Sequence, residues 1–394
     1  MAKLKVAFVV QRYGTDFAGG AESLTMRLAE GMRSDWNIKV LTTCAKDYRS
    51  WGNEYPEGDE VIHGVTVKRF QNDKVRNLSE FSKFHYDPAH ISEADEKWFF
   101  EEQGPHCPKL IKYIRDNRDN FDAFIFVTYL YYQTIYGVCE APGKAYLIST
   151  AHDEPPFHLK RTLAPIFRSI RGLIYLSDAE LHLIERFYTL DEKCAKIKAG
   201  YGVKVPTTDT SPASAIPNQK FRSLIEDGFF LYLGRASVTK LCQEMFAAFR
   251  LFKNNTGAKT KLLLGGSLDI ELPGHGSDIE YLGFLSEEEK SFLLANSIAL
   301  VNPSATESLS IVIQESWAHK RPVIINGDSA VMLEFCVASG GGVHYHSQEV
   351  FSACFEILHE NTSLTKQMGL AGERYVREHC TWETYRKALL EGVK

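Results

Sequence analysis

The order of strand, glycine-containing loop and helix at the start of the chain constrains its fold more than any other feature. The uniformly apolar run 6–10 is typical of a strand covered on both faces, and the loop after it contains Gly14, Gly19 and Gly20. A helix is expected over 22–32 and a second strand over 38–42. This order is that of a parallel βαβ unit and predicts a doubly wound α/β domain.

The same order begins again after a spacer rich in proline, serine and threonine. The spacer, 205–220, contains three prolines, and the apolar run 229–233 beyond it leads to a glycine and another helix. A length of 394 residues suits two domains of ordinary size. We therefore expect one domain over 1–204 and a second over 221–377, joined by a linker at 205–220.

Composition places the protein among globular proteins and disfavours nucleic acid as a partner. The chain is 44% hydrophobic and 24% charged, and its net charge of −5 lacks the basic excess usual in nucleic-acid binders. The eight cysteines form no CxxC pair, which is typical of buried thiols in a reducing compartment. Because no apolar run approaches about 18 residues and no leader precedes the first strand, a cytoplasmic protein is expected.

Glu307 and Glu315, separated by seven residues, are the most informative functional feature. Glu307 follows the apolar run 298–301, and Glu315 is expected about two turns into the next helix, roughly 12 Å away along the axis. A glycosidase pair needs about 5–9.5 Å, so that chemistry is disfavoured. The spacing suits two acceptors that bind hydroxyls at opposite ends of a nucleotide sugar, with its phosphates at the helix start. Taken alone, the pair could equally be a helix-start acid and a solvated carboxylate.

Two further groups of residues lie where strands are expected to end. Arg235 and Lys240 follow the first strand of the second half, and together a guanidinium fork and an ammonium can neutralise a diphosphate. His152 follows the apolar run 145–149 and is itself followed by two carboxylates, Asp153 and Glu154. Each group also has an ordinary explanation, as exposed cations at a helix start and as a structural histidine.

In the content and order of these motifs, nearly the whole chain resembles the retaining glycosyltransferases of family 4. Those enzymes have the GT-B fold, in which two Rossmann-like, doubly wound parallel-sheet domains face each other across a deep cleft. The resemblance implies a C-terminal helix over 378–394 that packs back on the N-terminal domain. It also implies that Glu307 approaches the transferred sugar, that Glu315 binds the ribose, and that His152 lies near the anomeric carbon. Asp153 or Glu154 would then either orient His152 or contact the acceptor.

The resemblance further implies which residues contact the donor. They are Gly19, Gly20, Arg235, Lys240, Gly266, Phe284, Leu285, Ser308, Leu309, Ser310 and Glu315. Two places depart from the family pattern: Ser308, Leu309 and Ser310 replace the usual Gly-Phe-Gly, and Leu241 replaces a glycine after Lys240. Any residue except proline supplies a backbone N–H, so phosphate binding is expected to survive these changes.

The implied activity is transfer of a hexose, glucose or a related sugar, from a UDP-sugar, with retention at the anomeric carbon. The implied acceptor is a saccharide or a lipid-linked saccharide in polysaccharide biosynthesis. No metal or other cofactor is expected, because Arg235, Lys240 and helix-start N–H groups supply the positive potential. The basic stretch 157–171 could rest peripherally on anionic lipid at the cytoplasmic face of a membrane, or it could be a solvated helix.

Two alternatives in the same fold stay open. A nucleotide-sugar 2-epimerase would release a free product and need no acceptor, and the motif departures are compatible with a catalytically silent GT-B partner subunit. An NAD-linked oxidoreductase is disfavoured, because no GxGxxG pattern opens the first helix.

Overall fold

The computed structural model describes residues 3–16, 19–206, 221, 225, 227–274 and 278–394. They divide into two compact units, which we call the N-terminal unit (Met1–Gly202 with Trp382–Lys394) and the C-terminal unit (Val203–Thr381). The first unit thus ends at Gly202, two residues before the expected boundary, and resumes at Trp382, after the expected 378. Most of the expected linker, 207–220, lies outside the described residues.

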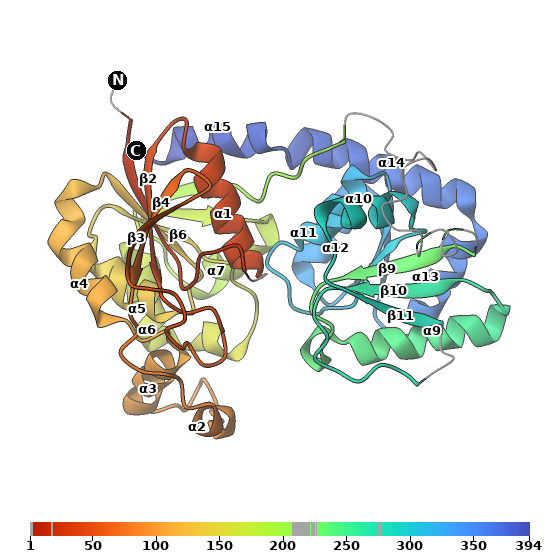
Figure 1. Ribbon diagram of the computed structural model, residues 1–394, viewed down its shortest axis with the longest axis horizontal. Coiled ribbons are helices and arrows are strands. Elements are labelled where there is room, and N and C mark those ends of the chain that lie inside the picture. Colours follow the sequence, from red (N-terminus) through yellow and green to blue (C-terminus); the bar gives the residue numbers. More distant parts are fainter. Residues whose placement is uncertain (1–2, 17–18, 207–220, 222–224, 226, 275–277) are drawn as a thin grey trace. The chain divides into compact units, whose positions relative to one another are not determined.

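The N-terminal unit is built on an eight-stranded sheet in the order β3-β4-β2-β1-β5-β6-β7-β8 (Figure 1). Among its described pairs only β3–β4 is antiparallel, and in the central pairs Phe8 lies beside both Val40 and Ile125. Its strands are β1 (Lys5–Val9), β2 (Asn37–Thr43), β3 (Gly58–Ile62), β4 (Val65–Phe70), β5 (Ala123–Val127), β6 (Ala145–Ile148), β7 (Gly172–Tyr175) and β8 (Ala195–Lys198). The apolar runs form strands because they are buried on both faces, as β1 and β5 show.

Helices cover this sheet and build an extension at one end. They are α1 (Gly20–Met32), α2 (Leu78–Lys83), α3 (Glu93–Gln103), α4 (Pro108–Asn117), α5 (Tyr132–Gly137), α6 (Lys160–Ser169), α7 (Asp178–Phe187) and α15 (Trp382–Gly392). α1 begins two residues before the expected start, at Gly20. The strand order turns at β1: β2 lies on one side of it and β5 on the other, so the loops after β1 and β5 flank a switch point.

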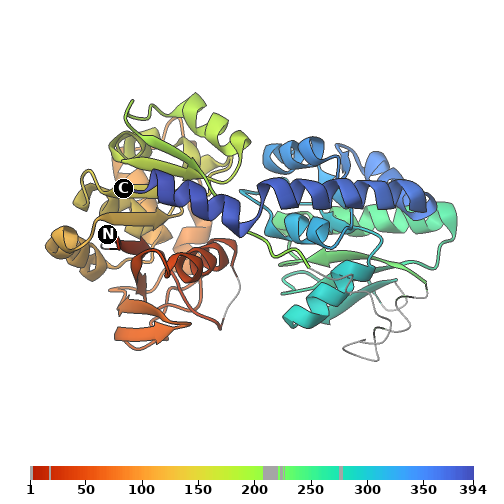
Figure 2. The same cartoon turned by 90° about the horizontal axis from the view of Figure 1, so that it is seen from above.

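The last helix, α15, belongs to the N-terminal unit. It packs on α1 and β8, as Figure 2 shows for α1. Arg386 of α15 forms a bidentate pair with Asp35, with its Nε and Nη2 atoms 2.9 Å and 2.5 Å from the carboxylate oxygens. Tyr146 OH lies 3.1 Å from the Lys394 backbone nitrogen, so the chain end is also bound to this sheet.

The C-terminal unit has a six-stranded parallel sheet in the order β11-β10-β9-β12-β13-β14. Its strands are β9 (Phe229–Leu233), β10 (Lys261–Gly265), β11 (Ile279–Gly283), β12 (Leu300–Asn302), β13 (Val323–Asn326) and β14 (Gly342–Tyr345). Helices α9 (Cys242–Thr256) and α13 (Gln348–Glu360) pack together over one face, in a core of phenylalanines from both helices and β9. α10 (Glu287–Asn296), α11 (Ile311–Ala318), α12 (Ala330–Ser339) and α14 (Thr362–His379) complete the unit.

The sheet order of the C-terminal unit reverses between β9 and β12, so the loops after these two strands flank its switch point. Arg235 follows β9 and Glu307 follows β12. None of the described helices is both long and apolar enough to cross a membrane.

Candidate functional site

Lys240 and Glu307 form an ion pair at the switch point of the C-terminal unit. Lys240 Nζ lies 2.7 Å from Glu307 Oε1, and it also lies 3.2 Å from Ser304 Oγ and 3.3 Å from the Thr306 carbonyl oxygen. The pair is only partly exposed, with 28% of the lysine side chain and 17% of the glutamate side chain accessible. The lysine expected at the diphosphate therefore contacts the carboxylate expected at the sugar.

Glu315 lies less deep in its helix than expected. α11 begins at Ile311, so Glu315 is its fifth residue, little more than one turn in, and residues 307–310 form a loop. The expected axial separation of about 12 Å applied a helical rise to residues 307–310, and that assumption was wrong because these residues form a loop. Glu315 nevertheless lies in the helix after Glu307, as expected.

Glu315 is also paired with a lysine. Lys290 Nζ of α10 lies 2.9 Å from Glu315 Oε1, and it lies 3.0 Å from Glu287 Oε2. Burial raises the pKa of Glu315, and the Lys290 ammonium opposes that rise. Lys290 was not among the expected site residues, because a lysine in a helix rich in glutamate is usually part of a solvated face.

The three residues after Glu307 form the entry to α11. Leu309 is buried, and Ser310 is the residue before the first helical turn, with φ 55° and ψ 71°. Asn302 Nδ2 donates to Ser310 Oγ at 2.8 Å, and within the described part of the chain this hydroxyl makes no capping hydrogen bond to α11. The first N–H groups of α11 therefore have no side-chain cap from Ser310 and suit an anion.

Two of the three departures from glycine in the family pattern, Leu241 and Ser310, fall on residues with a left-handed backbone. Leu241, just before α9, has φ 54° and ψ 35°, so its φ is close to the 55° of Ser310. This conformation costs an L-residue other than glycine roughly 1–2 kcal/mol. The loops thus keep the backbone shape that glycine adopts without strain.

The other expected donor residues of the C-terminal unit lie in loops at the same edge of its sheet. Arg235 Nε lies 3.9 Å from Asp269 Oδ2, and its carbonyl oxygen accepts a hydrogen bond of 2.8 Å from Tyr232 OH. Gly266 has φ 124°, and a Cβ there would collide with the Gly234 carbonyl oxygen. Phe284, after β11, is 74% exposed. The Leu285 side chain packs close to Gly265 and would collide with a Cβ atom there.

His152 follows β6 in the N-terminal unit, and the structure distinguishes its two neighbouring carboxylates. His152 Nε2 lies 3.3 Å from Glu154 Oε1, which also accepts a hydrogen bond of 2.7 Å from Tyr129 OH. Asp153 instead pairs with His158 at 2.6 Å. Burial by itself raises the pKa of Glu154, but the hydrogen bond and charge of His152 outweigh it and the net shift is downward. Glu154 is therefore the carboxylate that contacts His152.

Gly19 and Gly20 lie at the start of α1, beside a buried ion pair that the sequence analysis missed. A Cβ on Gly19 would collide with the carboxylate of Glu22, whereas the Cβ position of Gly20 is open. Arg12 Nε and Nη2 donate to Glu22 Oε1 at 2.9 Å and 2.7 Å, and Gln11 Nε2 donates to it at 3.0 Å. The glycine at 19 therefore leaves room for this pair.

The basic stretch 157–171 is partly neutralised. His158 pairs with Asp153, and Arg161 Nη1 lies 3.1 Å from Glu96 Oε2. Lys160, Arg168 and Arg171 are exposed.

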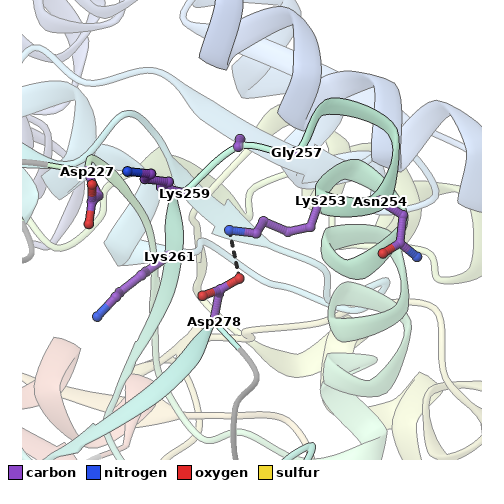
Figure 3. A pocket seen from close by; sticks show the side chains of 8 residues that line it. Asp227, Lys253, Asn254, Gly257, Lys259, Lys261 and Asp278 are labelled. Atoms are coloured by element: carbon purple, nitrogen blue, oxygen red, sulfur yellow. Dashed lines mark ion pairs between the residues drawn. The ribbon is translucent and has the colours of Figure 1, made fainter.

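A pocket of about 540 Å³ lies elsewhere in the C-terminal unit (Figure 3). It is lined by charged residues near the amino ends of the strands, among them Asp227, Lys253, Lys259, Lys261 and Asp278. Lys253 Nζ and Asp278 Oδ2 lie 2.7 Å apart, as the dashed line in Figure 3 marks. The expected donor residues follow the carboxyl ends of the same strands, so this pocket is a separate feature.

Comparison with known proteins agrees with the fold described above. Residues 216–374 match the family described as glycosyl transferases group 1. HepE from Anabaena, solved with UDP and glucose, superposes with a TM-score of 0.71 at 14% identity, covering 98% of both chains. Sucrose-phosphate synthase from Thermosynechococcus elongatus gives 0.71 at 14% identity, covering 99% of this chain and 98% of its own.

A third similar structure is that of WaaG, a glycosyltransferase involved in lipopolysaccharide biosynthesis. It gives a TM-score of 0.66 at 15% identity, covering 98% of this chain and 99% of its own. No curated protein matches the sequence. The expected GT-B fold is confirmed by these structures. The chain therefore has the GT-B fold, and its residues 216–374 are similar to the group 1 glycosyl transferases.

Proposed function

We propose that the protein transfers a hexose from a UDP-sugar to a saccharide or lipid-linked saccharide, with retention at the anomeric carbon. The observation that carries the proposal is the Lys240–Glu307 pair at the switch point of the region similar to the group 1 glycosyl transferases. Similar structures that hold UDP and UDP-glucose support the choice of donor. The C-terminal unit binds the donor, and the N-terminal unit receives the acceptor.

In this proposal the donor lies across the loops after β9 and β12. Arg235, Lys240 and the first N–H groups of α11 bind the diphosphate, because each places positive potential at the switch point. Glu307 accepts hydrogen bonds from hydroxyls of the transferred sugar, and Glu315 accepts them from the ribose. Phe284, Leu285 and Gly266 border the base.

The transfer itself exchanges one bond for another at the anomeric carbon. The bond from this carbon to the β-phosphate oxygen breaks, and UDP leaves with the electron pair. The acceptor oxygen forms the new bond on the same face and passes its proton to the departing phosphate. His152, held by Glu154, donates a hydrogen bond near the transferred sugar and so keeps the sugar in position for transfer.

The proposed chemistry needs no metal ion, because Arg235 and Lys240 stabilise the leaving diphosphate. Transfer that persists after treatment with EDTA would support this part of the proposal. Activity that disappears with EDTA and returns with Mg²⁺ would contradict it.

A thermal-shift screen of nucleotide sugars, followed by a transfer assay, tests the function. A preferred donor should raise the melting temperature, since it binds only the folded state. Labelled sugar should leave the nucleotide only when an acceptor is added. Release of a free epimerised sugar without acceptor would favour a 2-epimerase, and a donor that is bound but never consumed would favour a silent subunit.

Peripheral membrane contact through the exposed side chains of Lys160, Arg168 and Arg171 is a further part of the proposal. Flotation with vesicles containing phosphatidylglycerol at low salt should recover the protein, and replacing these three residues by glutamine should abolish recovery. Wild-type protein that stays with the soluble fraction would contradict the contact.

A further inference from the structure

Glu180, near the start of α7, accepts hydrogen bonds from the ends of two neighbouring strands. Its side chain is buried, with 1% of the residue exposed. Oε1 accepts from Ser149 Oγ at 2.6 Å and from the Ala151 backbone N–H at 2.7 Å, and Oε2 accepts from the Leu176 backbone N–H at 2.7 Å. One carboxylate therefore connects the loop after β6 with the end of β7.

The residue between two of these donors has a strained backbone. Thr150 has φ 50°, and Thr128, after the neighbouring strand β5, has φ 70°. Positive φ is a genuine outlier for a β-branched residue, and it persists only where surrounding contacts impose it. Glu180 binds the residues on both sides of Thr150, and Thr150 Oγ1 donates to Thr128 Oγ1 at 3.1 Å.

The strained segment leads directly to His152. The Ala151 N–H bound by Glu180 is one residue before His152, whose ring contacts Glu154. Glu154 in turn accepts from Tyr129, the residue after Thr128. The backbone that carries His152 is thus bound by one carboxylate and its ring is bound by another.

We infer that Glu180 is a positioning residue that fixes the loop carrying His152 in the orientation needed for transfer. This inference rests on the proposed role of His152. Replacing Glu180 removes an acceptor from the loop, so Thr150 can relax toward an ordinary backbone conformation and His152 shifts relative to Glu154. Such a change lowers the rate of transfer without weakening donor binding, because Arg235, Lys240 and Glu315, which bind the diphosphate and the ribose in this proposal, belong to the C-terminal unit.

Glu96 is a matched control for a purely structural role. It is 2% exposed and also accepts a backbone hydrogen bond, from Thr162 N–H at 2.7 Å, together with one from Arg161 Nη1 at 3.1 Å. These partners lie in α6 and not in the loop that carries His152. Glu180→Gln and Glu96→Gln each replace a buried carboxylate that accepts a hydrogen bond from a backbone N–H of the N-terminal unit.

Steady-state transfer from the preferred UDP-sugar is measured for the full-length wild type and both variants. For Glu180→Gln we expect kcat to fall about tenfold or more with the donor KM within about twofold, while Glu96→Gln keeps kcat within about twofold. A kcat loss in Glu180→Gln no larger than that in Glu96→Gln overturns the inference. If Glu180→Gln does not fold, Ser149→Ala is used, and a fall in kcat of about threefold with unchanged donor KM is expected; no fall overturns the inference.

An NMR measurement separates this inference from the proposed function. The His152 ring signals should move in Glu180→Gln and stay in place in Glu96→Gln, whether or not a sugar is transferred. Unmoved His152 signals in Glu180→Gln overturn the inference. If the wild type transfers no sugar from any UDP donor, the proposed function fails, and the ring signals still decide whether Glu180 positions His152.

Discussion

The two units hold their site carboxylates in different ways. In the C-terminal unit, Glu307 and Glu315 each pair with a lysine, Lys240 or Lys290, at 2.7 Å and 2.9 Å. In the N-terminal unit, Glu180 is held by two backbone N–H groups and a serine hydroxyl. The first arrangement joins flexible side chains, and the second joins a side chain to the backbone.

This difference suggests separate tasks for the two units. A lysine ammonium on a long, flexible stem can turn from a carboxylate toward a phosphate, so the pairs of the C-terminal unit suit a site that exchanges partners with its donor. Backbone N–H groups cannot turn in this way, so the Glu180 carboxylate suits a loop that keeps one shape. We therefore expect substitutions in the C-terminal unit to change donor binding and transfer. Substitutions in the N-terminal unit should change its pH dependence and the geometry of the loop that carries His152.

The largest effect is expected for Glu307→Gln. The amide keeps the size of the side chain but removes the charge that pairs with Lys240 and accepts from sugar hydroxyls. Transfer should fall about 10²–10³-fold in single-turnover assays, comparable to removal of one strong transition-state contact. Calorimetric affinity for UDP should stay within a few-fold of wild type. Full turnover would contradict the role of Glu307 and, with it, the task assigned to the lysine–carboxylate pairs of the C-terminal unit.

Glu180 should make the N-terminal unit sensitive to pH. Burial raises its pKa from 4.5 to about 7, so between these values the folded state binds more protons than the unfolded state. Its contribution to the free energy of unfolding therefore falls as pH rises from 4.5 to about 7, by up to roughly 3 kcal/mol. Urea unfolding of wild type and Glu180→Gln at pH 4.5 and pH 8 measures this. Equal pH dependence in the two proteins would contradict it.

Lys240→Met should weaken UDP binding about 10–30-fold, or about 1.4–2 kcal/mol, because it removes one charge-assisted contact to the diphosphate. The loss should shrink as salt is added, since screening weakens the wild-type contact. Lys253→Met is the matched control, because Lys253 pairs with Asp278 at 2.7 Å near the amino ends of the same sheet. Equal losses in both variants would show that the effect is a general change in charge.

The smallest effect is expected for Leu241→Gly. Glycine adopts the left-handed backbone of this residue without strain, so the C-terminal unit should gain up to about 1 kcal/mol in stability. Leu251→Gly is the control: Leu251 lies inside α9, where glycine should cost about 1 kcal/mol or more. Differential scanning calorimetry compares the two variants. A loss of stability in Leu241→Gly would show that the leucine side chain outweighs the backbone strain.

Much of the fold could be predicted, because local patterns decide it. The apolar runs 6–10 and 229–233 become the buried strands β1 and β9 within one residue at each end. The depth of Glu315 in α11 was mispredicted for a local reason as well: Ser310 takes a left-handed backbone, which delays the helix to Ile311. A pattern of apolar residues does not report the backbone angles of a loop.

The candidate site was predicted less completely, because its partners come from distant parts of the chain. Glu307 and Lys240 were each expected at the donor, but their direct pairing joins residues 67 positions apart. Lys290 and Glu180 were missed, since each resembles an ordinary charged residue near the start of a helix. Only the folded chain brings Lys290 to Glu315 and Glu180 to Ser149.

The sequence by itself determined the two α/β halves and the motif residues that follow their strands, because strand and helix periodicity and loop position are local properties. The tertiary structure decided which cation each carboxylate meets, which of Asp153 and Glu154 contacts His152, and where left-handed residues stand in for glycine. The physical reason is that ion pairs and backbone hydrogen bonds depend on distances of about 3 Å between elements. Those distances are set only when the sheets and their helices pack together.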